Sequence, residues 1–145
     1  RQGTRDLATR FRSVPLGDEV ANARDLLAAA GLEVEAEIAP DADEAPASAL
    51  GPVIRETTTN VLRHGAGRRA RLTLTRVPGG WRYEVVNDLR DDAGGDPVGS
   101  GLDGVRRRIA EVGGTLEVRE DGGDFVVAVT VPSHENMSES EEGRP

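Results

Sequence analysis

Residues 50–64 show a clear helical periodicity. Leu50, Val53, Ile54, Thr57 and Val61 follow the i, i+3, i+4, i+7 rule. This spacing predicts a helix over residues 51–64 that buries one face. We expect that face to form part of the hydrophobic core.

A row of polar side chains follows the same helix beside its apolar face. The row consists of Glu56, Asn60, Arg63 and His64. Oxygen ligands suit hard divalent cations, and cationic side chains suit phosphate, so the row could hold a hydrated cation beside an anionic group. The alternative is an ordinary solvated helix face.

Similar patterns elsewhere predict two more helices and five strands. Helices are expected over residues 16–30 and from about residue 102 to residue 112, each followed by glycine. Alternating apolar and polar residues predict strands over residues 32–38, 70–76, 81–87, 115–119 and 125–131. We therefore predict an α+β fold, a two-layer α/β sandwich. Its mixed, mostly antiparallel sheet would have about five strands, with about three helices on one face.

Alternation also predicts which way side chains point in the strand 81–87. Trp81, Tyr83, Val85 and Asn87 share the face that we expect to point inward. The Glu and Arg positions of the sheet are expected on its other face. Residues 89–98 are too polar and too rich in glycine to pack, which predicts a flexible loop that could act as a lid.

Composition narrows the classes of function. At 145 residues, of which 37% are hydrophobic, the chain is long enough for one domain with one core. A net charge of −8 argues against nucleic acid as a partner. The absence of cysteine excludes disulfides and fits a cytoplasmic location. No apolar run could cross a bilayer, so we expect no direct membrane contact here, while an inner-membrane anchor elsewhere in the parent stays open.

Patterning divides the chain into three parts. Residues 1–15 are charged and weakly patterned, and we expect them to connect the domain with a preceding element. Residues 16–132 contain all the predicted helices and strands. Residues 133–145 are mostly Ser, Glu, Gly and Pro, which predicts a disordered acidic tail. Because the sequence begins with Arg1 and not Met, we expect a longer parent protein.

A glycine-rich motif runs directly into the predicted helix near residue 102. It comprises Gly99, Ser100, Gly101, Leu102, Asp103 and Gly104. Glycines let backbone N–H groups approach an anion, and a helix N-terminus adds partial positive charge, so a phosphate could bind here. Taken alone, the motif could equally be an ordinary glycine-rich loop.

The order of these motifs resembles a known family. The chain looks like the catalytic ATP-binding domain of bacterial sensor histidine kinases. The matching features occur in the same order: the polar row on one helix, a strand ending at Asn87-Asp88, a loop, and the motif 99–104 before the next helix. This domain has the Bergerat fold of the GHKL superfamily. More narrowly, the chain resembles the subfamily that pairs with LuxR-type response regulators. The resemblance covers roughly residues 13–132.

The resemblance implies ATP and Mg²⁺ as cofactors and a role for each motif. Asn60 would ligate Mg²⁺, and Glu56 would be catalytic, holding a Mg²⁺-bound water or polarising the attacking imidazole. Arg63 and His64 would lie beside the phosphates of ATP. Residues of the glycine motif would contact these phosphates through their backbone, namely Gly99, Ser100, Gly101 and Leu102.

The resemblance also implies partners. The phosphoacceptor His would lie on a dimerisation domain of the same parent, which we expect to be homodimeric, and a LuxR-type response regulator would receive the phosphate. His64 is placed in the pocket and His134 in the tail, so neither is expected to be the acceptor.

The chain departs from the family where adenine would bind. The family has Asp-x-Gly-x-Gly after the strand, whereas this chain has Asn87, Asp88, Leu89, Arg90 and Asp91. Alternation gives Asn87 the adenine position, and its carbonyl oxygen can accept the hydrogen bond of the adenine amino group. A shift of one residue would place Asp88 there instead.

Two other functions remain open. An anti-sigma-factor serine kinase would use the same pocket to phosphorylate a small protein. A degenerate nucleotide-binding or interaction module would have lost the chemistry, and Leu89 and Arg90 in place of family residues favour that alternative.

Overall fold

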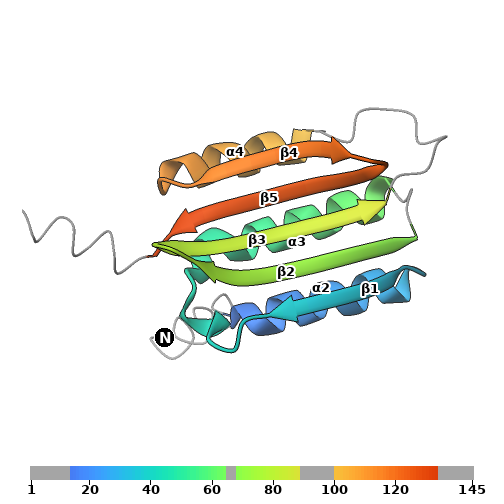
Figure 1. Cartoon of the computed structure of the whole chain (residues 1–145), viewed down its shortest axis with the longest axis horizontal. Helices are drawn as coiled ribbons and strands as arrows, with labels where there is room; N and C mark the ends of the chain where they lie inside the picture. Colours follow the sequence, from blue (N-terminus) through green and yellow to red (C-terminus); the bar gives the residue numbers. More distant parts are fainter. Residues whose placement is uncertain (1–13, 65–67, 89–99, 134–145) are drawn as a thin grey trace, which may run out of the picture.

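Five strands form one sheet, and helices cover one of its faces (Figure 1). The computed structural model describes residues 14–64, 68–88 and 100–133. Its elements are α2 (Leu16–Ala29), β1 (Glu33–Ile38), the 3-10 helix η1 (Ala42–Glu44), α3 (Ala47–His64), β2 (Arg69–Val77), β3 (Gly80–Asp88), α4 (Ser100–Glu111), β4 (Thr115–Asp121) and β5 (Asp124–Pro132). The predicted two-layer α+β fold is confirmed.

The sheet is mixed and has the strand order β1-β2-β3-β5-β4. Strand β1 runs parallel to β2, and every other neighbouring pair is antiparallel. The two tight hairpins, β2–β3 and β4–β5, come from the two glycine-containing turns. The parallel pair needs a long connection, and α3 supplies most of it by crossing the inner face.

The core lies between α3 and the middle of the sheet. The five residues of the predicted apolar face of α3 are all buried, and so are Trp81, Tyr83 and Val85 on β3. At about 25 cal/mol per Å² of apolar surface, a fully buried Val or Ile side chain contributes roughly 1.5–3 kcal/mol. Both predicted inner faces are therefore confirmed.

Helix α3 begins four residues earlier than its periodicity indicated. Its first turn contains Ala47 and Ser48, and the carbonyl of Pro46 accepts hydrogen bonds from the N–H groups of Ala49 and Leu50. The small side chains of this first turn do not form a distinct apolar stripe, so periodicity did not predict it. Pro52 follows inside the helix, where its missing N–H removes one backbone bond near the N-terminal end.

Candidate functional site

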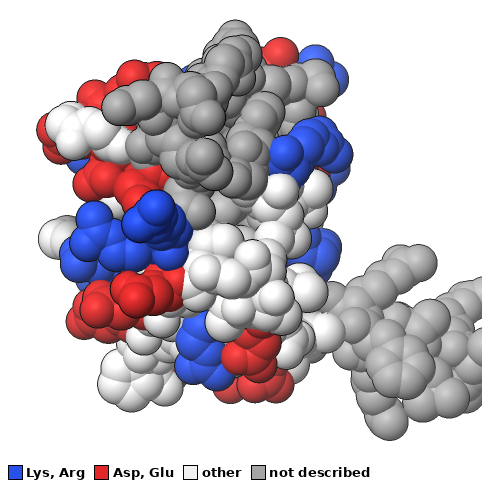
Figure 2. Space-filling view, turned by 90° about the vertical axis from the view of Figure 1, so that its right-hand side faces the viewer, with Lys and Arg blue, Asp and Glu red and all other residues white. Residues whose placement is uncertain are grey.

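Three segments that carry predicted site residues meet at one end of the molecule. They are the C-terminal end of α3, the end of β3 and the start of α4, all on the right-hand side of Figure 1. Helix α3 contacts both α4 and β3. Figure 2 looks onto this end and shows cationic and anionic side chains close together.

The polar row on α3 differs in burial from one residue to the next. Glu56 is half-buried, Asn60 is only 9% exposed, and Arg63 is exposed. Their i, i+4, i+7 spacing places them along one side of the helix. His64 is the last residue of α3, and its side chain lies outside the described residues. The row thus runs from the edge of the core out to solvent.

Asn87 lies on the inner face of β3, next to the end of the strand. Its side chain is 7% exposed, and its amide nitrogen donates a hydrogen bond to the carbonyl of Asp88 at 3.3 Å. Buried polar side chains are costly unless they are satisfied or used. The alternation that predicted an inward Asn87 is therefore confirmed, and this asparagine is the polar end of an otherwise apolar face.

Asp88 points to the opposite face and has a different task. Its carboxylate accepts hydrogen bonds from the backbone N–H groups of Arg68 and Arg69, both at 2.8 Å. Partial burial raises the pKa of Asp88, but these backbone hydrogen bonds and the charge of Arg69 outweigh it, so the pKa is lowered. The carboxylate of Asp88 thus holds the start of β2 in place through these two hydrogen bonds. Its use in this contact, on the face opposite to Asn87, does not support its predicted contact with a cofactor.

Replacing Asp88 with alanine should lower the free energy of unfolding by about 1–3 kcal/mol, because two charge-assisted hydrogen bonds are lost. A carboxyl with a depressed folded-state pKa stabilises fully above its unfolded pKa of about 3.9. That stability is lost as the pH falls through the folded value. Thermal melting from about pH 7 down to about pH 2.5 should show the gap between wild type and Asp88→Ala closing only in acid. A gap independent of pH would contradict this role.

Helix α4 begins with the glycine motif. It starts at Ser100, two residues before the predicted position, so Ser100, Gly101 and Leu102 form its first turn. The N–H groups of a first turn have no partner within the helix, and they favour an anion. Gly99, the predicted lid 89–98 and the departures Leu89 and Arg90 lie outside the described residues.

Leu102 anchors the start of α4 on the sheet. Its side chain is 1% exposed and packs with Phe125 and Val127 of β5. A ligand at the helix N-terminus could therefore meet only the backbone of Leu102. The apolar contact fixes where the first-turn N–H groups lie.

An ion pair that no sequence pattern predicted joins α2 and α3. Arg55 on α3 donates to the buried carboxylate of Glu19 on α2 at 2.7 Å. The partners are 36 residues apart, so no local pattern could have revealed the pair. Burial raises the pKa of Tyr83 on β3. The hydroxyl of Thr57 lowers this pKa and the charge of Glu19 raises it, and the net change is upward.

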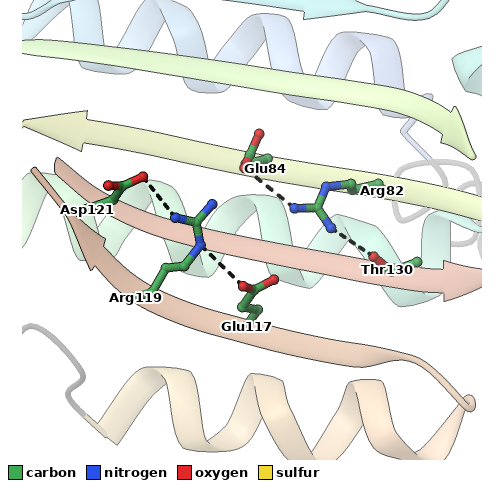
Figure 3. A network of polar contacts seen from close by, with 6 residues as sticks. All are labelled: Arg82, Glu84, Glu117, Arg119, Asp121 and Thr130. Atoms are coloured by element: carbon green, nitrogen blue, oxygen red, sulfur yellow. Dashed lines mark hydrogen bonds and ion pairs between the residues drawn. The ribbon is translucent and has the colours of Figure 1, made fainter.

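On the outer face of the sheet, charged side chains of β3, β4 and β5 pair with neighbours (Figure 3). Arg119 pairs with Glu117 at 3.2 Å and with Asp121 at 3.1 Å. Arg82 contacts Glu84 at 3.5 Å and Thr130 at 3.3 Å. Beneath these side chains, Val126 and Ala128 are buried. The prediction that Glu and Arg side chains line this face is confirmed.

Within the described ranges, protein side chains alone provide no metal centre. No group of three or more His, Asp or Glu side chains there could hold a metal ion. A cation near Asn60 would need further oxygen ligands from a bound molecule. None of the described helices is long and apolar enough to span a membrane.

Comparison with known proteins gives a curated sequence relative and solved structures with a related fold. No protein-family model matches the chain. The chain is 29% identical over 140 residues to the sensor histidine kinase YvfT of Bacillus subtilis (strain 168). This match covers 88% of the chain but only 35% of YvfT, so the chain spans about a third of this relative.

Solved structures of histidine kinases share the fold. The catalytic domain of histidine kinase ThkA has a TM-score of 0.62 at 16% identity, covering 83% of this chain and 93% of that domain. The histidine kinase domain of the Erythrobacter litoralis EL346 blue-light activated kinase has a TM-score of 0.62 at 20% identity, covering 86% and 64%. Acinetobacter baumannii AdeS has a TM-score of 0.60 at 16% identity, covering 82% and 63%.

Three observations agree on a similarity to histidine kinases. They are the strand order, the placement of α2, α3 and α4 on one face of the sheet, and the sequence match. The chain is similar in sequence to a sensor histidine kinase and has the fold of histidine kinase catalytic domains.

Proposed function

We propose that this chain is the ATP-binding catalytic domain of a sensor histidine kinase. It would donate the γ-phosphate of ATP to a His on a dimerisation domain of the same parent. The observation that carries the proposal is the pair of buried asparagines, Asn60 and Asn87, at the end of the molecule where α4 begins. Two buried amides beside a glycine-rich helix N-terminus suit a ligand that carries both a base and phosphates.

Each end of the nucleotide would meet different residues. Because the nitrogen of Asn87 is occupied by Asp88, its carbonyl oxygen is the atom that can accept from the amino group of adenine. The phosphates would lie against the backbone of Gly99, Ser100, Gly101 and Leu102, with Arg63 and His64 beside them. These contacts bind and orient the donor, which is most of what phosphoryl transfer requires from a protein.

Asn60 and Glu56 would act closest to the reaction. The side-chain oxygen of Asn60 would hold a Mg²⁺ ion, which neutralises charge on the phosphates. Glu56, one turn earlier and half-buried, would accept a hydrogen bond from a Mg²⁺-bound water or from the acceptor imidazole. Its intermediate burial lets the carboxylate stay charged and still face the site.

The wider setting is part of the same proposal. A LuxR-type response regulator would take the phosphate from the acceptor His, the parent would be a homodimer, and this domain would work in the cytoplasm. The narrower sequence resemblance supports this setting. The serine-kinase and degenerate-module alternatives make different predictions in the two experiments that follow.

ATP should bind the full chain more tightly with Mg²⁺ than without it. Asn60 would supply a single ligand atom, which is too few to hold Mg²⁺. The phosphates of ATP must therefore provide further ligands, and the bound ion in turn stabilises the phosphates. Calorimetry with and without a chelator measures the difference, which we expect to be about tenfold or more in Kd. Binding that is intact but independent of the metal would refute the role given to Asn60.

Phosphotransfer tests the proposed function itself. Incubated with labelled ATP alone, the chain should not label itself, but it should label the dimerisation domain of its parent when that domain is added. Transfer needs an acceptor positioned in line with the γ-phosphate. Acid-labile phosphate on the added domain is the expected result. Acid-stable phosphoserine on a small protein would favour the serine-kinase alternative, and no binding of ATP at millimolar concentration would favour the degenerate module.

A further inference from the structure

A groove with exposed apolar walls runs along the seam between α2 and α3. Leu26 and Leu62 are the large apolar side chains that remain exposed among the described residues, at 56% and 37%. They line a groove of about 330 Å³ together with Ala23 and Ile54. Exposed leucines on facing helices are costly in water and mark a surface that another apolar group covers.

The seam continues towards the start of α2. A second groove of about 410 Å³ is lined by Val14, Ala47, Ser48, Gly51 and Pro52. Both grooves include Glu19 and Arg55, so they meet at the ion pair that joins the two helices. Val14 is the first described residue. The preceding thirteen residues therefore enter the described structure at the open end of this seam.

The sequence of residues 1–13 matches the seam in apolar spacing and in charge. Leu7 and Phe11 are four residues apart, so in an extended segment they would lie on one side at about 13 Å from each other, close to the roughly 15 Å of helix between Pro52 and Leu62. The segment has four arginines and one aspartate, whereas α2 has three carboxylates and one arginine. Opposite net charges favour their association.

The distances along the chain also fit. Phe11 is three residues from Val14, so it can reach at most about 10 Å from it. Leu7 is seven residues away and reaches up to about 24 Å when extended, which is enough to span the roughly 15 Å of helix from Leu16 to Leu26. Pro15 disfavours a helical conformation at Val14, which allows the chain to reverse there and run back along α2.

We propose that residues 1–13 cover this seam, with Phe11 over the Pro52 end and Leu7 against Leu26 and Leu62. This segment would then contact α3 on the side opposite to Glu56 and Asn60. The docking itself does not depend on nucleotide chemistry. Only its consequence, a direct contact between this segment and the helix of the proposed nucleotide site, rests on the proposed function.

Disulfide trapping tests the docking, because the chain has no native cysteine. The test pairs are Phe11→Cys with Ser48→Cys, and Leu7→Cys with Thr59→Cys. The control is Phe11→Cys with Glu117→Cys, which lies on the outer face of the sheet. Under mild oxidation of the dilute full chain, we expect both test pairs to form intramolecular disulfides at least about tenfold faster than the control. Equal rates, or only disulfides between two chains, would overturn the proposal.

A second measurement avoids any effect of the cysteines. Leu7→Ala and Leu62→Ala should each lower the melting temperature of the full chain, and the double variant should lower it by less than the sum, because the two side chains share one contact. Strict additivity would overturn the proposal. Neither measurement contains nucleotide, so failure here is separate from failure of the proposed function.

Discussion

Asn60→Asp is expected to weaken ATP binding by about 30- to 150-fold and to abolish phosphotransfer. Asp keeps the ligand oxygen but replaces the amide N–H donor with a second, charged acceptor, and losing such a donor beside a charged ligand costs about 2–3 kcal/mol, where each 1.4 kcal/mol is tenfold in affinity. Asn60 is 9% exposed, so the new carboxylate would be poorly solvated. It would also repel phosphates that come close to it. Calorimetry with Mg²⁺ and ATP, beside a phosphotransfer assay, measures both effects.

Three further variants separate binding from folding. Thr59→Ala changes the exposed neighbour on another side of α3 and should leave ATP binding unchanged. Glu56→Ala should stop phosphotransfer while ATP binding stays within about threefold of wild type, as expected for a group needed mainly in the transition state. If Asn60→Asp lowered the melting temperature as much as Val53→Asp does, the polar row would be structural and the assignment would fail.

Gly80→Ala is expected to lower the free energy of unfolding by about 3 kcal/mol or more, which corresponds to roughly 10 °C in Tm. A Cβ at Gly80 would collide with the backbone carbonyl oxygen of Val131, and Pro132 Cα would be 3.0 Å away. Gly80 pairs with Pro132 in the antiparallel ladder between β3 and β5. Two backbones cannot separate there without breaking ladder hydrogen bonds, so the clash cannot relax cheaply. Differential scanning calorimetry measures the loss.

Gly104→Ala provides the matched control. Gly104 lies within α4, and a Cβ there would meet nothing within 4 Å. Alanine is about 0.5–1 kcal/mol better than glycine inside a helix, so this variant should be more stable than wild type. A loss of stability in both variants would mean that the steric explanation for Gly80 is wrong.

Periodicity predicted the elements that have a strong apolar face. The spacing of Val53, Ile54 and Thr57 fixed the buried side of α3, and the alternation from Trp81 to Asn87 fixed the inner side of β3. The same alternation placed Asn87 inward and Asp88 outward, which separates two neighbours that motif comparison alone left ambiguous. Periodicity works here because each element has one dry face and one wet face.

Other features depend on contacts between distant residues. Nothing near Glu19 indicates that Arg55 is its partner, and nothing near Asp88 indicates that it caps the start of β2. The first turns of α3 and α4 were missed because alanine, serine and glycine give no apolar signal. The groove around Leu26 and Leu62 was missed because periodicity shows which residues are apolar but not which of them another element covers.

Amide hydrogen exchange of the full chain, with and without Mg²⁺ and ATP, is the most direct test of the proposed nucleotide site. Nucleotide should slow exchange at three separate segments that meet at one end of the molecule: residues 56–64 of α3, residues 85–88 of β3 and residues 100–105 of α4. Exchange in β4 and on the α2 side of the seam should not change. No protection at millimolar ATP, or protection confined to the outer face of the sheet or to the α2–α3 groove, would contradict the proposed nucleotide site.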